Sequence, residues 1–129
     1  MARLLTGDER PLDWVGSSKR DFLKFPDPVK SEMGYALGVA QLGGKHAAAK
    51  PWHGRGPGVL ELVERYDGNT YRAVYTVSFK EVVYVLHAFE KKSPRGIKTA
   101  RPDVDLVERR LKAARADHEE RCGKAKQWR

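Results

Sequence analysis

The chain has little cysteine and no long apolar run. Cys122 is the only cysteine among the 129 residues, so an internal disulfide is excluded. One cysteine and four histidines are also too few for a cysteine-rich zinc site. No apolar stretch approaches the roughly 20 residues of a membrane span, and residues 1–10 lack the apolar core of a signal peptide. These absences predict a protein of the reducing cytoplasm.

The standard nucleotide-binding motifs are missing as well. The sequence contains neither the GxGxxG dinucleotide fingerprint nor the P-loop pattern GxxxxGKS or GxxxxGKT, and nothing in it predicts a cofactor. The length allows one domain. We therefore predict a single domain over residues 1–129, with a core over 12–120 and a flexible tail over 122–129.

Positive charge is concentrated in the last third of the chain. Lys and Arg number 25 against 17 Asp and Glu, which gives a net charge of +8. Residues 91–129 hold thirteen of the basic residues and six of the acidic ones, a surplus of seven. Such a surplus attracts polyanions, and nucleic acid is the commonest polyanion in a cell. The alternative is a solvated basic helix that only aids solubility.

Hydrophobic periodicity predicts helices followed by a small sheet. Asp27-Pro28 has the chemistry of a helix start, and Asp67-Gly68-Asn69 that of a hairpin turn. An α+β fold is expected, with two N-terminal helices packed on a three-stranded antiparallel meander. The predicted elements are a short strand over 12–16, helices over 18–25 and 28–42, a loop over 43–58, strands over 59–66, 70–78 and 82–89, and a basic C-terminal helix over about 102–121.

Cationic and imidazole side chains gather around the predicted meander. Guanidinium and ammonium groups neutralise a phosphodiester and the charge that grows on it in the transition state, and imidazoles transfer protons near neutral pH. RNA then cleaves itself without a metal when its 2′-hydroxyl is aligned with the adjacent phosphate. The scarcity of Asp and Glu in this region argues against a two-metal nuclease. The residues concerned are Lys50, His53 and Arg55 before the first strand of the meander, Arg72 and His87 within it, and Lys91, Lys92 and Arg95 after it.

Several of these residues also have a plainer explanation. Lys91 and Lys92 after a strand are typical of a solvated loop. His87 among apolar neighbours is typical of a buried histidine that has a hydrogen-bond partner. Arg72 has a carboxylate within reach in Glu61. The residues alone leave both explanations open.

Four short motifs lie between Lys50 and Pro94. They are a Lys-Pro loop with a following glycine, an ELR-type strand, a Tyr-Arg strand, and an LHAFxKK strand end followed by proline. In this sequence they are Lys50-Pro51-Trp52 with Gly54, Glu61-Leu62-Val63, Tyr71-Arg72, and Leu86-His87-Ala88-Phe89-Glu90-Lys91-Lys92 with Pro94. The pattern resembles the phage-derived Gp49-like, or HigB-like, branch of the RelE/ParE toxin superfamily, over about residues 12–120.

The resemblance implies a RelE-like fold and a type II toxin that a cognate antitoxin neutralises. The implied antitoxin is HigA-like and carries a helix-turn-helix, and the toxin–antitoxin complex binds operator DNA. RelE- and HigB-like members cut mRNA, usually on the ribosome and without a metal. ParE-like members share the fold but inhibit DNA gyrase. A third hypothesis is a catalytically inactive phage-derived protein that binds only its partner.

The resemblance also implies roles for particular residues. Val63 stands where the ELR motif has arginine. Either Arg65, two residues later on the same face, substitutes for that arginine, or the implied RNA cleavage is weak. The implied catalytic residues are Arg72, Lys91 and Lys92, which would hold the phosphate, and His87 or His53, which would transfer protons. The implied substrate-binding residues are Lys50, Arg65 and Arg95.

Overall fold

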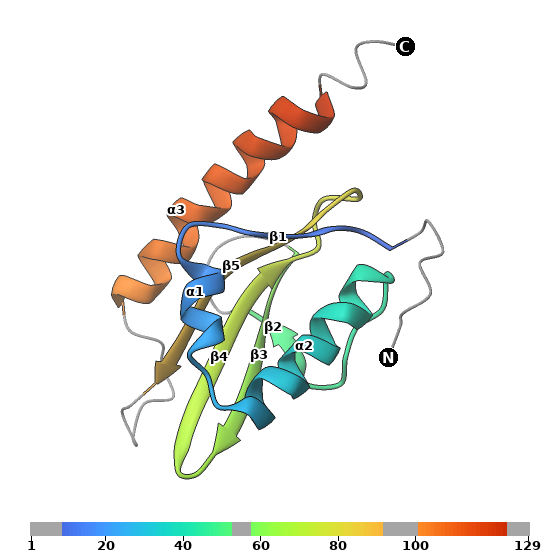
Figure 1. The fold of residues 1–129 in the computed structure, drawn as a ribbon. Helices are drawn as coiled ribbons and strands as arrows, with labels where there is room; N and C mark the ends of the chain where they lie inside the picture. The colour runs from blue at the N-terminus through green and yellow to red at the C-terminus, as the bar shows by residue number, and fades with distance from the viewer. Residues whose placement is uncertain (1–8, 53–57, 92–100, 124–129) are drawn as a thin grey trace.

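The structure is a five-stranded sheet with helices on both faces (Figure 1). The computed structural model describes residues 9–52, 58–91 and 101–123. The strand order is β1-β5-β4-β3-β2, with β1 parallel to β5 and all other neighbours antiparallel. The elements are β1 (Leu12–Trp14), α1 (Ser18–Leu23), α2 (Asp27–Gln41), β2 (Ala49–Pro51), β3 (Val59–Tyr66), β4 (Asn69–Thr76), β5 (Val83–Lys91), α3 (Arg101–His118) and a π-helical turn (Glu119–Gly123).

Two hydrophobic clusters, one on each face of the sheet, hold the layers together. Successive residues of a strand point to opposite faces, so the long strands contribute to both clusters. The predicted packing of two N-terminal helices on a small antiparallel sheet is confirmed. The cluster of α1 and α2 includes Phe22, Met33, Leu37, Leu62, Ala73 and Tyr75. The cluster of α3 includes Val59, Val74, Tyr84, Leu86, Val107 and Leu111.

The meander β3-β4-β5 agrees closely with its prediction. β3 occupies the predicted residues, because apolar and polar residues alternate along it and a turn signal follows. Asp67 and Gly68 form the turn to β4 with φ values of 52° and 81°. Positive φ at both central residues is what a type I′ hairpin turn requires. The bounds of β4 and β5 differ from the prediction by at most two residues.

The predicted loop over residues 43–58 is wrong at Ala49–Pro51, which form β2. This strand pairs antiparallel with Leu60, Glu61 and Leu62 of β3. The segment shows no alternation, and Pro51 cannot donate a backbone hydrogen bond. Its strand conformation follows from a tertiary contact with β3, which local periodicity does not encode.

Two N-terminal elements are confirmed with small changes. The predicted strand over 12–16 is β1, and it lies parallel to the start of β5. α2 begins at Asp27, so Pro26 is its N-cap and Pro28 is its second residue instead of its first. Proline is tolerated there because the first N–H groups of a helix have no partner within the helix.

The predicted C-terminal helix is present as α3, but its own charge is nearly balanced. It contains five Lys and Arg against four Asp and Glu. The basic surplus belongs instead to its flanks, since residues 91–100 contain four basic residues and residues 124–129 contain three, with no acidic residue in either segment. No helix in the described part of the chain is long and apolar enough to cross a membrane.

Candidate functional site

Two of the predicted cations, Arg72 and Lys91, lie close together on the α3 face of the sheet. Arg72 of β4 is opposite Phe89, and Lys91 is opposite Thr70, so the two cations occupy successive rows of one face. Lys91 is the last residue of β5 and not the first of the following loop. Burial lowers the pKa of Lys91, and the charge of Arg72 lowers it further. Two positive charges held together in this way favour the binding of an anion.

Glu61 of β3 holds the guanidinium of Arg72. The Nη1 atom of Arg72 donates to the Oε1 atom of Glu61 in an ion pair. Only 11% of the Arg72 side chain and 1% of the Glu61 side chain are exposed. The plainer explanation for Arg72, a pair with this carboxylate, is therefore confirmed. A phosphate at Arg72 would share the guanidinium with Glu61.

A β-bulge in β5 turns His87 toward α3. Val74 of β4 is opposite His87, whereas the next residue, Tyr75, is opposite Val85. Leu86 is therefore the extra residue of the bulge. A bulge of this kind opposes two residues of one strand to one residue of the other. Leu86 and His87 accordingly both face the layer formed by α3.

His87 is buried between β5 and the start of α3, with 6% of its surface exposed. Its Nε2 atom lies 2.8 Å from the Oδ1 atom of Asp103 in the first turn of α3. The imidazole stacks on the ring of Phe89, with centroids 4.5 Å apart and planes inclined by 21°. Burial lowers the pKa of His87 more than the hydrogen bond and charge of Asp103 raise it. His87 is thus a buried imidazole with a hydrogen-bond partner, and its lowered pKa favours the neutral form.

The lowered pKa of His87 predicts a dependence of stability on pH. Above about pH 6.5 the imidazole is neutral in both the folded and the unfolded chain. Below that pH the unfolded chain takes up a proton that the folded chain does not, so the free energy of unfolding falls. Urea unfolding of wild type and His87→Gln between about pH 7 and pH 5 measures this effect. The wild type should lose stability more steeply than the variant, and equal slopes would contradict the prediction.

Arg110 of α3 fastens the bulge to the helical layer. Its Nη1 atom donates to the carbonyl oxygen of Leu86 at 3.0 Å, and its Nη2 atom donates to Oγ of Ser17 at 3.0 Å. Gly16 has a φ of 59°, and a Cβ atom at this position would lie 2.9 Å from the guanidinium of Arg110. Gly16 therefore leaves the space in which Arg110 reaches the sheet. The orientation of His87 depends on residues from α3 and from the segment before α1.

Two further predicted residues lie on the same face and are exposed. Lys50 of β2 is opposite Glu61, and Arg65 of β3 is opposite Thr70. Pairs across a sheet share a face, so both residues extend the cationic surface around Arg72. The remaining predicted residues lie outside the described part of the chain; they are His53, Lys92 and Arg95.

Two carboxylates contradict the expectation that acidic residues are scarce in this region. Glu61 and Asp103 both lie near the cations, and the charge of each raises the pKa of Lys91. Asp103 lies in the first turn of α3, and its contact with His87 spans sixteen positions. No sequence signal joins such a pair. Among the residues that the structure describes, no group of three or more His, Cys, Asp and Glu could hold a metal ion.

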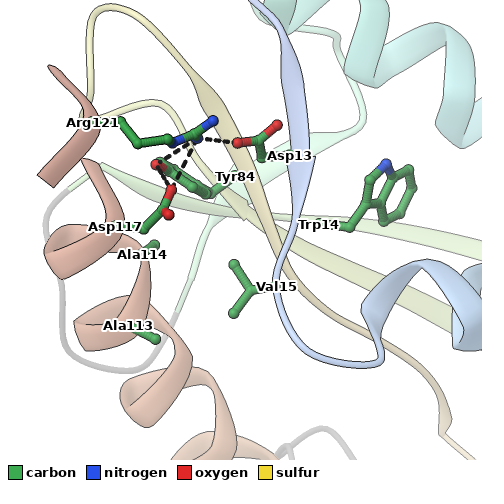
Figure 2. Close-up of a pocket in the computed structure, with 8 residues that line it drawn as sticks. All are labelled: Asp13, Trp14, Val15, Tyr84, Ala113, Ala114, Asp117 and Arg121. Carbon is green, nitrogen blue, oxygen red and sulfur yellow. Dashed lines mark hydrogen bonds and ion pairs between the residues drawn. The ribbon is translucent and has the colours of Figure 1, made fainter.

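A pocket of about 380 Å³ lies at the other end of α3 (Figure 2). There Arg121 forms ion pairs with Asp13 and with Asp117. The hydroxyl of Tyr84 donates to Oδ2 of Asp117 at 2.7 Å, and burial together with this bond raises the pKa of Tyr84 to about 12. These polar groups pair with one another and include none of the predicted site residues. We interpret them as fastening the end of α3 to β1 and β5.

Comparison with known proteins agrees with this fold. The family model "Phage derived protein Gp49-like (DUF891)" matches residues 20–112. A mutant of the E. coli toxin RelE in the free state is 19% identical, with a TM-score of 0.52 over 81% of this chain and 97% of that chain. The isolated E. coli RelE toxin is 21% identical, with a TM-score of 0.51 over 78% and 97%. No match was found among curated proteins. The chain belongs to the Gp49-like family of phage-derived proteins, and it has a RelE-like fold.

Proposed function

We propose that the chain is the toxin of a type II toxin–antitoxin system and cuts mRNA on translating ribosomes, in the cytoplasm and without a metal. The observation that carries the proposal is the pair of cations, Arg72 and Lys91, on one face of a RelE-like sheet. Two positive charges in this arrangement suit a phosphodiester. The family match and the two RelE toxins of similar fold support the same function.

In the proposed reaction the RNA supplies its own nucleophile. The 2′-oxygen forms a bond to the adjacent phosphorus while the bond from phosphorus to the 5′-oxygen breaks. The products are a 2′,3′-cyclic phosphate and a 5′-hydroxyl, so one proton leaves the 2′-hydroxyl and one reaches the 5′-oxygen. Arg72, Lys91 and Lys92 neutralise the charge that grows on the phosphate oxygens.

Proton transfer requires an acid and a base that the RNA can reach, and the residues implied for it are His87 and His53. The Nε2 atom of His87 is bonded to Asp103 and the ring is buried, so His87 would act only if the start of α3 moved. We propose that His53 or, after such a movement, His87 transfers the protons, and that His87 holds Asp103 while α3 stays in place. The exposed side chains of Lys50 and Arg65 would bind the rest of the substrate. We propose the same role for Arg95, which lies outside the described residues.

We propose a HigA-like antitoxin with a helix-turn-helix as the partner, and binding of the complex to operator DNA. An exposed cationic surface must be kept from cellular RNA until it is needed. An acidic segment of the antitoxin that covers Lys50, Arg65 and Lys91 would do so by charge complementarity. Co-expression of the antitoxin should then restore growth.

One observation favours a second function, a phage-derived protein that binds its partner without cutting RNA. Arg72 is already paired with Glu61 inside the protein. Its cross-strand neighbour Val63 stands where the related motif has arginine. A site that lacks an arginine at position 63 and contains the carboxylate of Glu61 stabilises a phosphate less than a site with both arginines free.

Primer extension on total RNA after brief induction tests the proposed nuclease. The variants are the double substitution Lys91→Ala/Lys92→Ala and a control, Lys80→Ala. Lys80 is exposed in the connection between β4 and β5. Wild type and control should produce new cuts within translated mRNA. The double variant should produce none while keeping a normal melting curve.

Other results of this experiment would contradict the proposed nuclease or its site. Growth arrest with intact mRNA would contradict the nuclease, and a DNA damage response would then indicate gyrase. Intact mRNA with normal growth would favour the partner-binding protein. Cuts by a folded double variant would move the site away from the end of β5.

A further inference from the structure

Phe89 of β5 lies at the side of the cationic surface that faces the start of α3. It is opposite Arg72 across the strands, and it shares a face of β5 with His87 and Lys91, because alternate residues of a strand point the same way. Its ring packs against the hydrophobic cluster of α3 and remains partly exposed. An aromatic ring therefore lies beside both cations that we assign to the phosphate.

The ring of Phe89 is held in place by its neighbours. It stacks on the imidazole of His87 at a centroid distance of 4.5 Å, and His87 is fixed by its 2.8 Å contact with Asp103. A side chain that is already ordered loses little conformational entropy when a ligand binds. Phe89 thus offers a preorganised apolar surface next to two positive charges.

We propose that Phe89 is the stacking platform for one unpaired base of a single-stranded RNA whose phosphates bind Arg72 and Lys91. This inference rests on the proposed function and narrows its substrate to an unpaired stretch of RNA. Proteins that bind single strands combine cations along the backbone with aromatic rings on which bases stack. In a duplex the bases are already paired and stacked, so a duplex could not use Phe89 in this way.

A similar arrangement at the other end of α3 provides a matched control. Phe79 packs on His118 with centroids 4.6 Å apart, and the Nε2 atom of His118 lies 2.6 Å from Oε1 of Glu81. The ring, imidazole and carboxylate recur there, but Phe79 contacts Tyr84, whose hydroxyl is bonded to Asp117. The cation of this region, Arg121, is already paired with Asp13 and Asp117, so a phosphate is not expected beside Phe79.

The experiment measures binding of two short oligonucleotides to the full chain at low salt. The first is a fluorescein-labelled 2′-O-methyl RNA hexamer, in which the blocked 2′-oxygen prevents cleavage. The second has the same backbone and no bases. Phe89→Leu should weaken binding of the first about tenfold and leave binding of the second unchanged. Phe89→Tyr, which keeps the ring, and the control Phe79→Leu should bind both as wild type does.

Lys91→Ala separates failure of this inference from failure of the proposed function. It should weaken both hexamers and reduce the slope of binding against salt by about one unit. Suppose that Lys91→Ala has this effect. The stacking inference alone is then overturned if Phe89→Leu binds both hexamers as wild type does, or if Phe89→Leu weakens binding of both hexamers equally. If wild type binds neither hexamer, the stacking inference is overturned, and primer extension on cellular RNA decides the proposed function separately.

Discussion

Replacing Arg72 with glutamine should abolish RNA cleavage and destabilise the fold at the same time. Loss of one group that stabilises charge in the transition state costs about 100-fold or more in rate. The same change deprives Glu61, whose side chain is 1% exposed, of its arginine. Removing one partner of a buried ion pair costs about 3–5 kcal/mol. RNA cleavage measures the first effect, and urea unfolding followed by circular dichroism measures the second.

The double variant Glu61→Gln/Arg72→Gln separates the two effects. Two amides can bond to each other across β3 and β4 without a buried charge, so most of the lost stability should return. Cleavage should stay absent because no cation remains at the phosphate position of β4. Recovery of cleavage would show that Arg72 does not hold the phosphate. A single variant as stable as wild type would show that the ion pair is not buried in solution.

Replacing Arg110 with methionine should destabilise the fold by about 2–4 kcal/mol, since hydrogen bonds to charged groups contribute about 1.5–3 kcal/mol each. Methionine keeps an apolar stem but loses the donors to Leu86 and Ser17. The charge of Arg110 also lowers the pKa of His87, so this pKa should rise in the variant. Urea unfolding measures the stability, and an NMR titration of the imidazole measures the pKa. A stable variant with an unchanged His87 pKa would contradict the role given to Arg110.

Gly16→Ala should disturb the same guanidinium of Arg110, because Gly16 lies against it. A side chain at positive φ costs about 1–2 kcal/mol, and the added methyl group would also force the guanidinium of Arg110 to withdraw. This second cost disappears when residue 110 is already methionine. The two substitutions together should therefore cost less than the sum of their separate effects. Additive costs would show that Gly16 and Arg110 do not interact.

Local patterns in the sequence were sufficient to predict most elements of the fold. Alternation placed Arg72 on the face opposite Tyr71, and the Asp-Gly signal located the hairpin after β3. β2 was missed because three residues ending in Pro51 have no period of their own. Both outcomes have the same cause. Periodicity indicates which residues of one helix or strand are buried, but it does not indicate which strands pair with each other.

The partners of the site residues were harder to predict. The orientation of His87 depends on one extra residue in β5, and Leu86 has no local mark of a bulge. Its contact with Asp103 joins a strand to a helix sixteen positions later. Glu61 could be considered as a partner of Arg72 because the two lie on adjacent strands, but the depth of their burial depends on the whole fold.

α3 contacts the sheet near both ends. Asp103 bonds to His87 at its start, and Asp117 bonds to Tyr84 in its last turn, where Arg121 of the following π-helical turn also pairs with Asp13. The place of the helix is therefore set by contacts with the sheet and not by the connection that precedes it. The segment over 92–100 carries three basic residues and no acidic one. A change in the length or composition of this segment should therefore leave α3 in place, because both ends of the helix keep their own contacts with the sheet.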